Sequence, residues 1–321
     1  MKKWLLVIVL FLLMQQPAQA GGHAYAVIDA KTGRLLSGTN VNDELPIASL
    51  TKMWTALIVI ENSDLKDVVT VSEKASLAEG SSIYLQAGET YTVETLLYGL
   101  MLRSGNDAAY ALAEHVGGSV EGFVHLMNQR ALFAGLSHTK FTNPSGLHHE
   151  EHLSSAYDTA RMLQIAMKNK TFKKIATTVV YNGKYSWKNK HKLLTQNNGA
   201  IAGKTGFTKV AGRTLATFFE RDQKQFIVVT LNESNDWQVH NALANDVYAN
   251  YAERTIVKKG TYYVSGEKII VQEPIKLLAT KDEVETLRHV VYLPTNPSNK
   301  NATWYVYDEG RPVLSVPVKR K

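Results

Sequence analysis

A serine and a lysine lie three residues apart in the segment PIASLTKMWTALIVIE, residues 46–61. A serine hydroxyl is a weak nucleophile that needs an adjacent base, and a lysine amine can serve only if its pKa is lowered. Residues three apart share one face of a helix, so Ser49 and Lys52 are a candidate nucleophile and base. A capping serine and a lysine that reaches solvent explain the same spacing. That spacing also occurs at Ser63–Lys66, Ser137–Lys140 and Ser265–Lys268.

Two polar triplets further along the chain decide between these interpretations. Ser104-Gly105-Asn106 interrupts a helical pattern, and Lys204-Thr205-Gly206 lies in a strand-like segment. S-x-x-K, an S-x-N-like triplet and K-T-G, in this order, are typical of penicillin-binding proteins and class A β-lactamases. We therefore interpret Ser49 as the nucleophile.

Each triplet adds a group that the chemistry requires. Burial of Lys52 and a like charge from Lys204 would lower the pKa of Lys52. To bring this pKa from its ordinary value to near 7, the two effects must together disfavour the charged amine by about 4 kcal/mol. Ser104 can relay a proton to the leaving amine, and Asn106 can orient Lys52 and the substrate amide. A strand edge at 204–206 can pair with an extended peptide. There Gly206 permits close approach and Thr205 can bond a substrate carboxylate.

The pattern around these motifs predicts an α/β fold. Strands are expected at 24–38 as a hairpin and again at 201–207, 213–219 and 225–234; helices are expected from residue 49, at 92–118 with a break at 104–106, at 119–136, from about 154 and at 237–251. The late strands are too close for crossover helices, so the sheet should be antiparallel. A second Lys-Thr-Gly at 31–33 lies in the first hairpin turn, and we expect it to be structural.

The two ends of the chain suggest further boundaries. Residues 1–20 combine a basic start, an apolar stretch and an Ala-Gln-Ala site, which predicts a secretory signal peptide. Helical patterns stop near Arg254, and short alternating segments follow. We therefore expect a serine peptidase domain at 21–254 and a small β-rich domain at 255–321. The chain has no cysteine, which excludes disulfides, thiolate metal sites and cysteine lipidation.

Four segments, 47–61, 80–128, 141–160 and 203–216, resemble the low-molecular-mass penicillin-binding proteins that are serine D-Ala-D-Ala carboxypeptidases. The resemblance covers about residues 23–254, and the segments 187–195 and 232–240 look most like the Bacillus-type branch that acts on the spore cortex. It implies a transpeptidase/β-lactamase-like domain, an antiparallel sheet with helices on both faces, followed by a β-rich domain. It also implies peptidoglycan stem peptides as substrates and β-lactam antibiotics as covalent inhibitors. Cofactors, metals and nucleic acid are not expected.

The resemblance assigns roles to individual residues. Ser49 would be acylated, Lys52 would be the base, and the backbone N–H groups of Ser49 and Phe207 would form the oxyanion hole. The other site residues are Ser104 and Asn106, which complete the pocket, and Lys204, Thr205 and Gly206, which hold the substrate.

The chain departs from the family pattern at two places. Many members carry an arginine near the position of Asp236 and Trp237, where this chain has none, so Arg213 or a lysine should bind the substrate carboxylate instead. A C-terminal amphipathic anchor is not visible in RPVLSVPVKRK, residues 311–321. We therefore expect an exported protein on the outer side of the membrane or in the cell wall, with at most peripheral membrane contact.

Three competing functions fit the sequence less well. A β-lactamase needs a downstream E-x-x-x-N pattern, but Ser154 and Ser155 follow Glu150 and Glu151 at that spacing. A zinc peptidase needs H-E-x-x-H, which HHEEH at 148–152 does not provide, so we expect a polar surface loop there. A catalytically idle wall-binding protein would not need the intact motifs, and acylation by penicillin would distinguish it from an enzyme.

Overall fold

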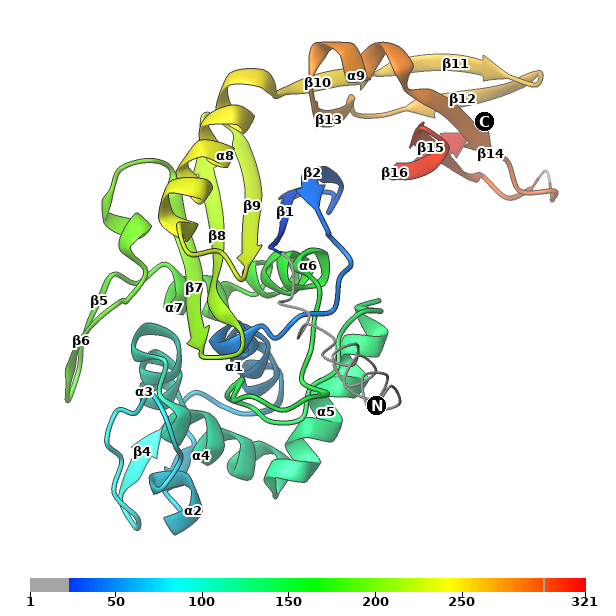
Figure 1. Ribbon diagram of the computed structural model, residues 1–321. Coiled ribbons are helices and arrows are strands. Elements are labelled where there is room, and N and C mark those ends of the chain that lie inside the picture. Colours follow the sequence, from blue (N-terminus) through cyan, green and yellow to red (C-terminus); the bar gives the residue numbers. More distant parts are fainter. Residues whose placement is uncertain (1–22, 297) are drawn as a thin grey trace, which may run out of the picture.

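The N-terminal part of the protein is built on a five-stranded sheet (Figure 1). The computed structural model describes residues 23–296 and 298–321, so the predicted signal peptide lies outside the described residues. The strand order is β2-β1-β9-β8-β7, and every pairing is antiparallel, as predicted. The strands are β1 (Ala24–Asp29), β2 (Leu35–Thr39), β7 (Ala200–Thr208), β8 (Gly212–Arg221) and β9 (Lys224–Leu231).

Helices cover both faces of this sheet, which confirms the predicted fold class. Apolar side chains alternate along the strands, so Ile227 and Val229 pack in the helical cluster on one face, while Phe226 and Val228 pack against α8 on the other. The first face and the lobe beyond it contain α1 (Thr51–Asn62), α2 (Glu73–Ser76), α3 (Val93–Tyr98), α4 (Asn106–Gly117), α5 (Val120–Phe133), α6 (Ala156–Met167) and α7 (Lys170–Ala176). The opposite face is covered by α8 (Asp236–Asn250) (Figure 1).

The start of α1 is unusual. A short 3-10 turn, Ala48–Leu50, precedes the helix, and Ala48 has a φ of +48°, a conformation that non-glycine residues seldom adopt. Every residue from 51 to 59 is buried. The helix is therefore enclosed on most sides, as the sequence predicts, and Ser49 lies at its entrance.

Two small two-stranded sheets were not predicted from the sequence. β3 (Val68–Thr70) pairs with β4 (Thr90–Thr92), and β5 (Val180–Asn182) pairs with β6 (Ser186–Lys188). Strands of three residues are too short to show a clear alternation of apolar and polar side chains. Aromatic stacking holds the β5–β6 hairpin, because the Tyr181 ring lies against the rings of Tyr98 and Trp187, with centroids 4.2 and 5.6 Å away.

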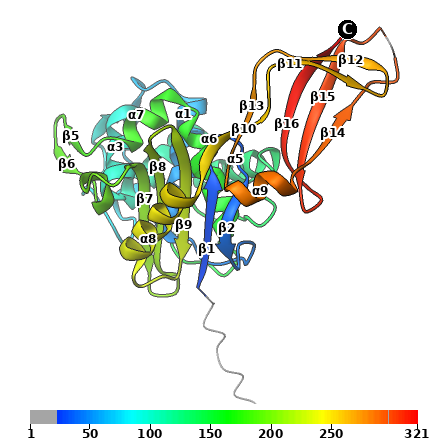
Figure 2. The ribbon, with the colours of Figure 1, turned by 90° about the horizontal axis from the view of Figure 1, so that it is seen from above.

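The C-terminal part is rich in strands and extends away from the first sheet (Figure 2). β10 (Ala252–Val257) pairs with β13 (Ile275–Ala279), and a second sheet has the order β11-β12-β16-β15-β14. The strands of that sheet are β11 (Gly260–Val264), β12 (Glu267–Val271), β14 (Arg288–Tyr292), β15 (Asn301–Asp308) and β16 (Arg311–Arg320). The proposed boundary at residue 254 falls within β10.

The expectation that helices stop near Arg254 is wrong. A short helix, α9 (Lys281–Thr286), follows β13. Six residues are too few to show a helical period, but Thr280 and Glu283 form a reciprocal capping box, a signal that the sequence already contained.

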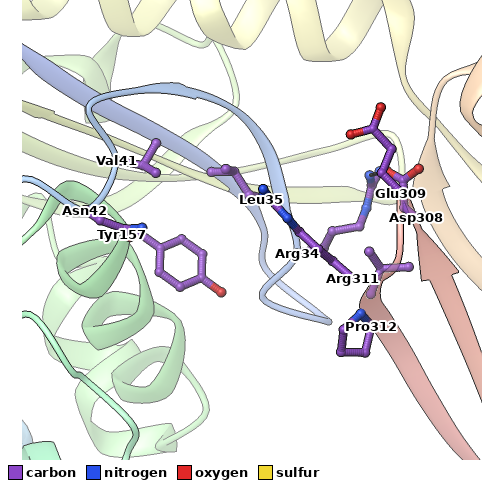
Figure 3. Close-up of a pocket in the computed structure, with 10 residues that line it drawn as sticks. Arg34, Leu35, Val41, Asn42, Tyr157, Asp308, Glu309, Arg311 and Pro312 are labelled. Atoms are coloured by element: carbon purple, nitrogen blue, oxygen red, sulfur yellow. Dashed lines mark ion pairs between the residues drawn. The ribbon is translucent and has the colours of Figure 1, made fainter.

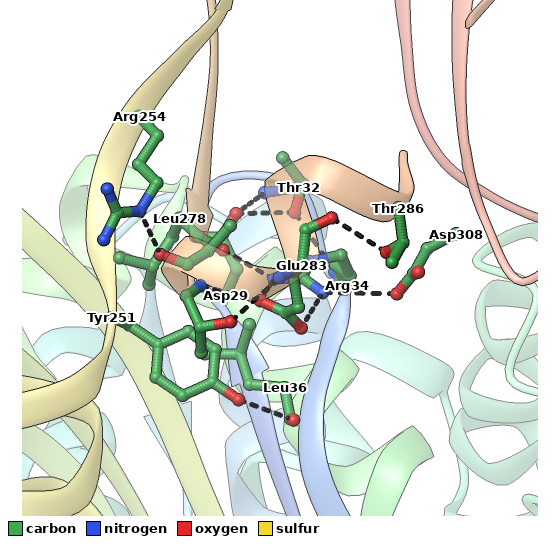
Figure 4. A network of polar contacts seen from close by, with 12 residues as sticks. Asp29, Thr32, Arg34, Leu36, Tyr251, Arg254, Leu278, Glu283, Thr286 and Asp308 are labelled. Carbon is green, nitrogen blue, oxygen red and sulfur yellow. Dashed lines mark hydrogen bonds and ion pairs between the residues drawn. The ribbon is translucent and has the colours of Figure 1, made fainter. Parts of the chain in front are cut away.

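A buried arginine joins the two parts. Arg34 is 7% exposed and donates hydrogen bonds to Glu283 Oε1 at 2.9 Å and to the Leu278 carbonyl at 2.6 Å (Figure 4). The second Lys-Thr-Gly forms the turn that leads to Arg34, where the Thr32 hydroxyl donates to Asp29 at 2.6 Å. This motif is therefore a structural turn, as predicted.

A pocket of about 320 Å³ lies at the same junction (Figure 3). Its walls come from the first hairpin, from Tyr157 and from the turn between β15 and β16. The residues that line it include none of the predicted site residues.

Candidate active site

The three predicted motifs meet at the free edge of β7. Ser49 comes from the turn before α1, Ser104 ends a π-helical turn (Gly99–Arg103), Asn106 begins α4, and Lys204 lies on β7. A pocket of about 340 Å³ opens here. Five of the predicted residues line it: Ser49, Ser104, Thr205, Gly206 and Phe207. The other three, Lys52, Asn106 and Lys204, have buried side chains.

Lys52 is hydrogen-bonded to the predicted nucleophile. Its Nζ lies 2.9 Å from Ser49 Oγ, 2.6 Å from Asn106 Oδ1 and 2.6 Å from the Ser145 carbonyl oxygen. Burial lowers the pKa of Lys52 well below its ordinary value, and the positive charges of Lys204 and Lys190 lower it further. A neutral amine keeps two N–H donors, enough for Asn106 and Ser145, and directs its lone pair at the Ser49 proton. The geometry is that of a serine and its general base.

Lys204 and Ser104 form a second pair. Lys204 Nζ donates to Ser104 Oγ at 3.0 Å and to the Thr205 carbonyl at 2.7 Å. Burial, followed by the charge of Lys190, lowers the pKa of Lys204 to about 7. Ser104 has a φ of +67°, so the chain turns sharply at this serine, just before α4. Two weakly basic lysines thus reach two serine hydroxyls of one site.

Gly206 brings the strand against the nucleophile. A Cβ atom at this position would lie 2.4 Å from Thr214 Oγ1 and 2.9 Å from the backbone nitrogen of Ser49. Both separations are too short for a real side chain, so only glycine allows β7 to pass this close to the Ser49 amide. Phe207, the next residue, is 65% exposed at the pocket rim.

Asp107 and Ser145 were missed by the sequence analysis. Asp107 is fully buried, and its carboxylate accepts hydrogen bonds from the Ser82 hydroxyl at 2.6 Å and the Leu85 amide at 3.1 Å. Asn106 donates to the Glu79 carbonyl. Together they hold the loop that carries Ser81 to the pocket wall. The signal for Asp107 was an acidic residue in the first turn of a predicted helix. A backbone carbonyl such as that of Ser145 leaves no signal.

The HHEEH segment is only partly the surface loop that we predicted. Residues 148–151 are exposed, but His152 is 2% exposed. Its ring bonds Thr51 Oγ1 at 2.8 Å and accepts from the Thr142 amide at 3.1 Å, and burial lowers its pKa to about 4. A neutral histidine here ties the loop to α1. Glu150 and Glu151 do not line the pocket around Ser49.

Arg213 lies in the pocket wall, where a substitute for the family arginine was expected. It is on β8, paired with Phe207, and its side chain is 41% exposed. Its Nη2 and Nε donate to the two carboxylate oxygens of the buried Asp236 at 2.8 and 3.1 Å. The guanidinium lies 5.7 Å from the Trp237 ring centroid. Asp236 and Trp237 therefore orient an arginine that still faces the pocket.

Three features together define a peptidase of the penicillin-binding type, whose own serine is acylated. They are an antiparallel sheet between helical layers, a serine hydrogen-bonded to a buried lysine, and an edge strand that carries Lys-Thr-Gly. The family model for D-alanyl-D-alanine carboxypeptidase matches residues 13–235, and the chain belongs to this family. Family membership supports a serine-type carboxypeptidase that acts on peptidoglycan.

Individual relatives agree in sequence and in fold. D-alanyl-D-alanine carboxypeptidase DacF of Bacillus subtilis (strain 168) is 32% identical over 280 residues, 80% of this chain and 72% of that protein. The D-alanyl-D-alanine carboxypeptidase crystal structure from Mycobacterium tuberculosis H37Rv is 30% identical, with a TM-score of 0.67 over 70% of this chain and 90% of that one. Penicillin binding protein 5 from Haemophilus influenzae is 23% identical and has the same fold, with a TM-score of 0.77 over 92% and 95% of the two chains.

Proposed function

We propose that the protein removes the terminal D-alanine from peptidoglycan stem pentapeptides through an acyl-enzyme on Ser49. The contact between the buried Lys52 amine and Ser49 Oγ, at 2.9 Å, carries this proposal. Lys52 takes the hydroxyl proton as Oγ attacks the carbonyl of the penultimate D-alanine. The C–N bond then breaks, and the leaving amine receives a proton through Ser104. Water hydrolyses the ester on Ser49 and releases the shortened peptide.

The remaining site residues bind the substrate in this proposal. An extended peptide pairs with the free edge of β7, as an added strand. Thr205 and Arg213 bind the terminal carboxylate, and the amides of Ser49 and Phe207 stabilise the oxyanion. Asn106 orients Lys52 and the substrate amide. β-Lactam antibiotics acylate the same serine and act as covalent inhibitors.

We predict that the purified protein releases D-alanine from an N-acylated peptide that ends in D-Ala-D-Ala, with water as the main acceptor. The competing function is tested on nitrocefin in the same preparation. Slow acylation followed by very slow release is expected, because Asp236 is the only carboxylate among the described residues that line the pocket, and its two oxygens both bond Arg213. Nitrocefin turnover at the rate of a true β-lactamase, without release of D-alanine, would reverse the assignment.

We predict that Arg213→Ala raises KM for this peptide by about tenfold or more, the effect of losing a hydrogen bond between charged groups. A peptide whose terminal carboxylate is amidated should bind equally weakly to both proteins. Arg221→Ala is the matched control, because Arg221 is an arginine of the same strand that pairs with Asp222 outside the pocket. An unchanged KM in Arg213→Ala would assign the carboxylate to another residue.

The proposed setting is outside the cytoplasm. The signal-like residues 1–20 support export, and the resemblance of 187–195 and 232–240 to the Bacillus-type branch supports a role in sporulation. Among the residues that the structure describes, no helix is long and apolar enough to span a membrane. A mature protein that begins at Gly21 and is released from cells by high salt would support this setting. An intact N-terminus that is recovered only with detergent would contradict cleavage.

A further inference from the structure

Three cations beside the pocket form a group that we call the basic cluster: Arg103, Lys190 and Lys192. Lys190 and Lys192 line the pocket. Arg103 lies close to Lys190, because it donates to the Lys188 carbonyl at 3.3 Å and its charge lowers the pKa of Lys190. Within residues 23–296 and 298–321, no carboxylate lies at ion-pair distance from any of the three.

The fold holds these like charges close together although they repel one another. The backbone N–H of Lys190 donates to the Leu102 carbonyl at 3.2 Å. The next residue, His191, is buried, and its Nε2 lies 3.0 Å from Thr217 Oγ1. The segment is thereby tied to β8. Repulsion between adjacent cations favours the binding of an anion next to them.

The basic cluster adds more positive charge to the pocket than the binding of a single substrate carboxylate requires. Arg213 already presents a guanidinium to the pocket, and it is held in place by Asp236, the one carboxylate in the described part of the pocket wall. If Arg213 takes the terminal carboxylate, Lys190 and Lys192 remain for a second anionic group.

The position of the cluster indicates which part of the substrate carries that group. Lys190 and Lys192 line the same pocket as Ser104, whose hydroxyl accepts a hydrogen bond from the Lys204 amine at 3.0 Å. In the proposed function Ser104 passes a proton to the leaving amine. The basic cluster therefore adjoins the leaving group.

We propose that the basic cluster binds a second carboxylate carried by the leaving group, so that the enzyme releases acidic residues and carboxylate-bearing peptides, as well as D-alanine, from D-alanyl bonds. The inference rests on the proposed function, and the chemistry is unchanged. The D-alanyl C–N bond breaks, the leaving amine gains a proton and water hydrolyses the ester on Ser49.

Two matched peptides test the proposal on the full mature protein. They are N-acylated, identical up to the penultimate D-alanine, and end in D-Glu or in D-Gln, which differ in one charge. We expect kcat/KM to be about fivefold higher for the D-Glu peptide, the scale of a partly exposed ion pair. The preference should shrink at high salt, because salt screens exposed charges. In Lys192→Gln the ratio should fall close to one.

Lys188→Gln is the control, because Lys188 is exposed on the same segment and does not line the pocket. It should keep the wild-type ratio, and penicillin labelling checks that both variants are folded. If Lys192→Gln is not labelled, Lys190→Gln replaces it. Equal kcat/KM for the two peptides in the wild-type protein would overturn the inference while D-Ala-D-Ala cleavage stands. An unchanged ratio of the two kcat/KM values in Lys192→Gln, or in Lys190→Gln where it replaces that variant, would do the same. Failure to cleave the peptide that ends in D-Ala-D-Ala would instead overturn the proposed function.

Discussion

Ser49→Ala is expected to abolish covalent labelling by penicillin completely while leaving the protein folded. The acyl bond forms on Oγ, which alanine lacks, and no other hydroxyl accepts a hydrogen bond from the Lys52 amine in the described structure. The loss of one hydrogen bond at the helix entrance should cost only about 1 kcal/mol of unfolding free energy. Intact-protein mass spectrometry measures the adduct, and far-UV circular dichroism checks the fold.

Ser63→Ala is a matched control for this experiment. Ser63 also precedes a lysine by three residues, but it lies at the C-terminal end of α1, where its hydroxyl donates to the Val59 carbonyl at 2.8 Å. This variant should be labelled like the wild type. A penicillin adduct that persists in Ser49→Ala would show that the nucleophile is another residue.

Lys52→Arg is expected to reduce the rate of acylation by at least about 100-fold, the usual contribution of general-base catalysis. Arginine keeps the positive charge but stays protonated, so it cannot take the Ser49 proton. Stopped-flow acylation with a fluorescent penicillin gives the rate. Because the longer arginine side chain could disturb the buried site, Lys52→Met provides a second variant that has similar size and no base.

The pH dependence of the same rate gives an independent check on Lys52. Only the neutral amine is a base, and burial together with the charges of Lys204 and Lys190 lowers the pKa of Lys52. The acylation rate should therefore rise with pH until Lys52 is deprotonated, and then level off well below the ordinary lysine pKa of 10.5. Lys66→Arg, a change of an exposed lysine, should leave both rate and profile unchanged. Near-wild-type acylation in Lys52→Arg would mean that another group activates Ser49.

The sequence by itself determined the order of the motifs, the α/β class, the antiparallel sheet and the identity of the candidate nucleophile. These properties depend on residue types and on local periodicity, which are visible without the fold. The β-rich character of the C-terminal part was visible for the same reason. The short helix α9 and the two small two-stranded sheets were not predicted, because elements of three to six residues carry too little periodic signal.

Only the tertiary structure decided how far the pKa of each site group is shifted and which other groups lie beside it. The pKa of Lys52 depends on burial by several helices and on charges from β7 and the segment before it, far away in the chain. Arg213 faces the pocket because β8 pairs with β7, and His152 is buried because its loop packs on α1. The basic cluster exists because the end of the π-helical turn, at Arg103, lies next to Lys190. Such arrangements follow from contacts between distant segments, and no local pattern encodes them.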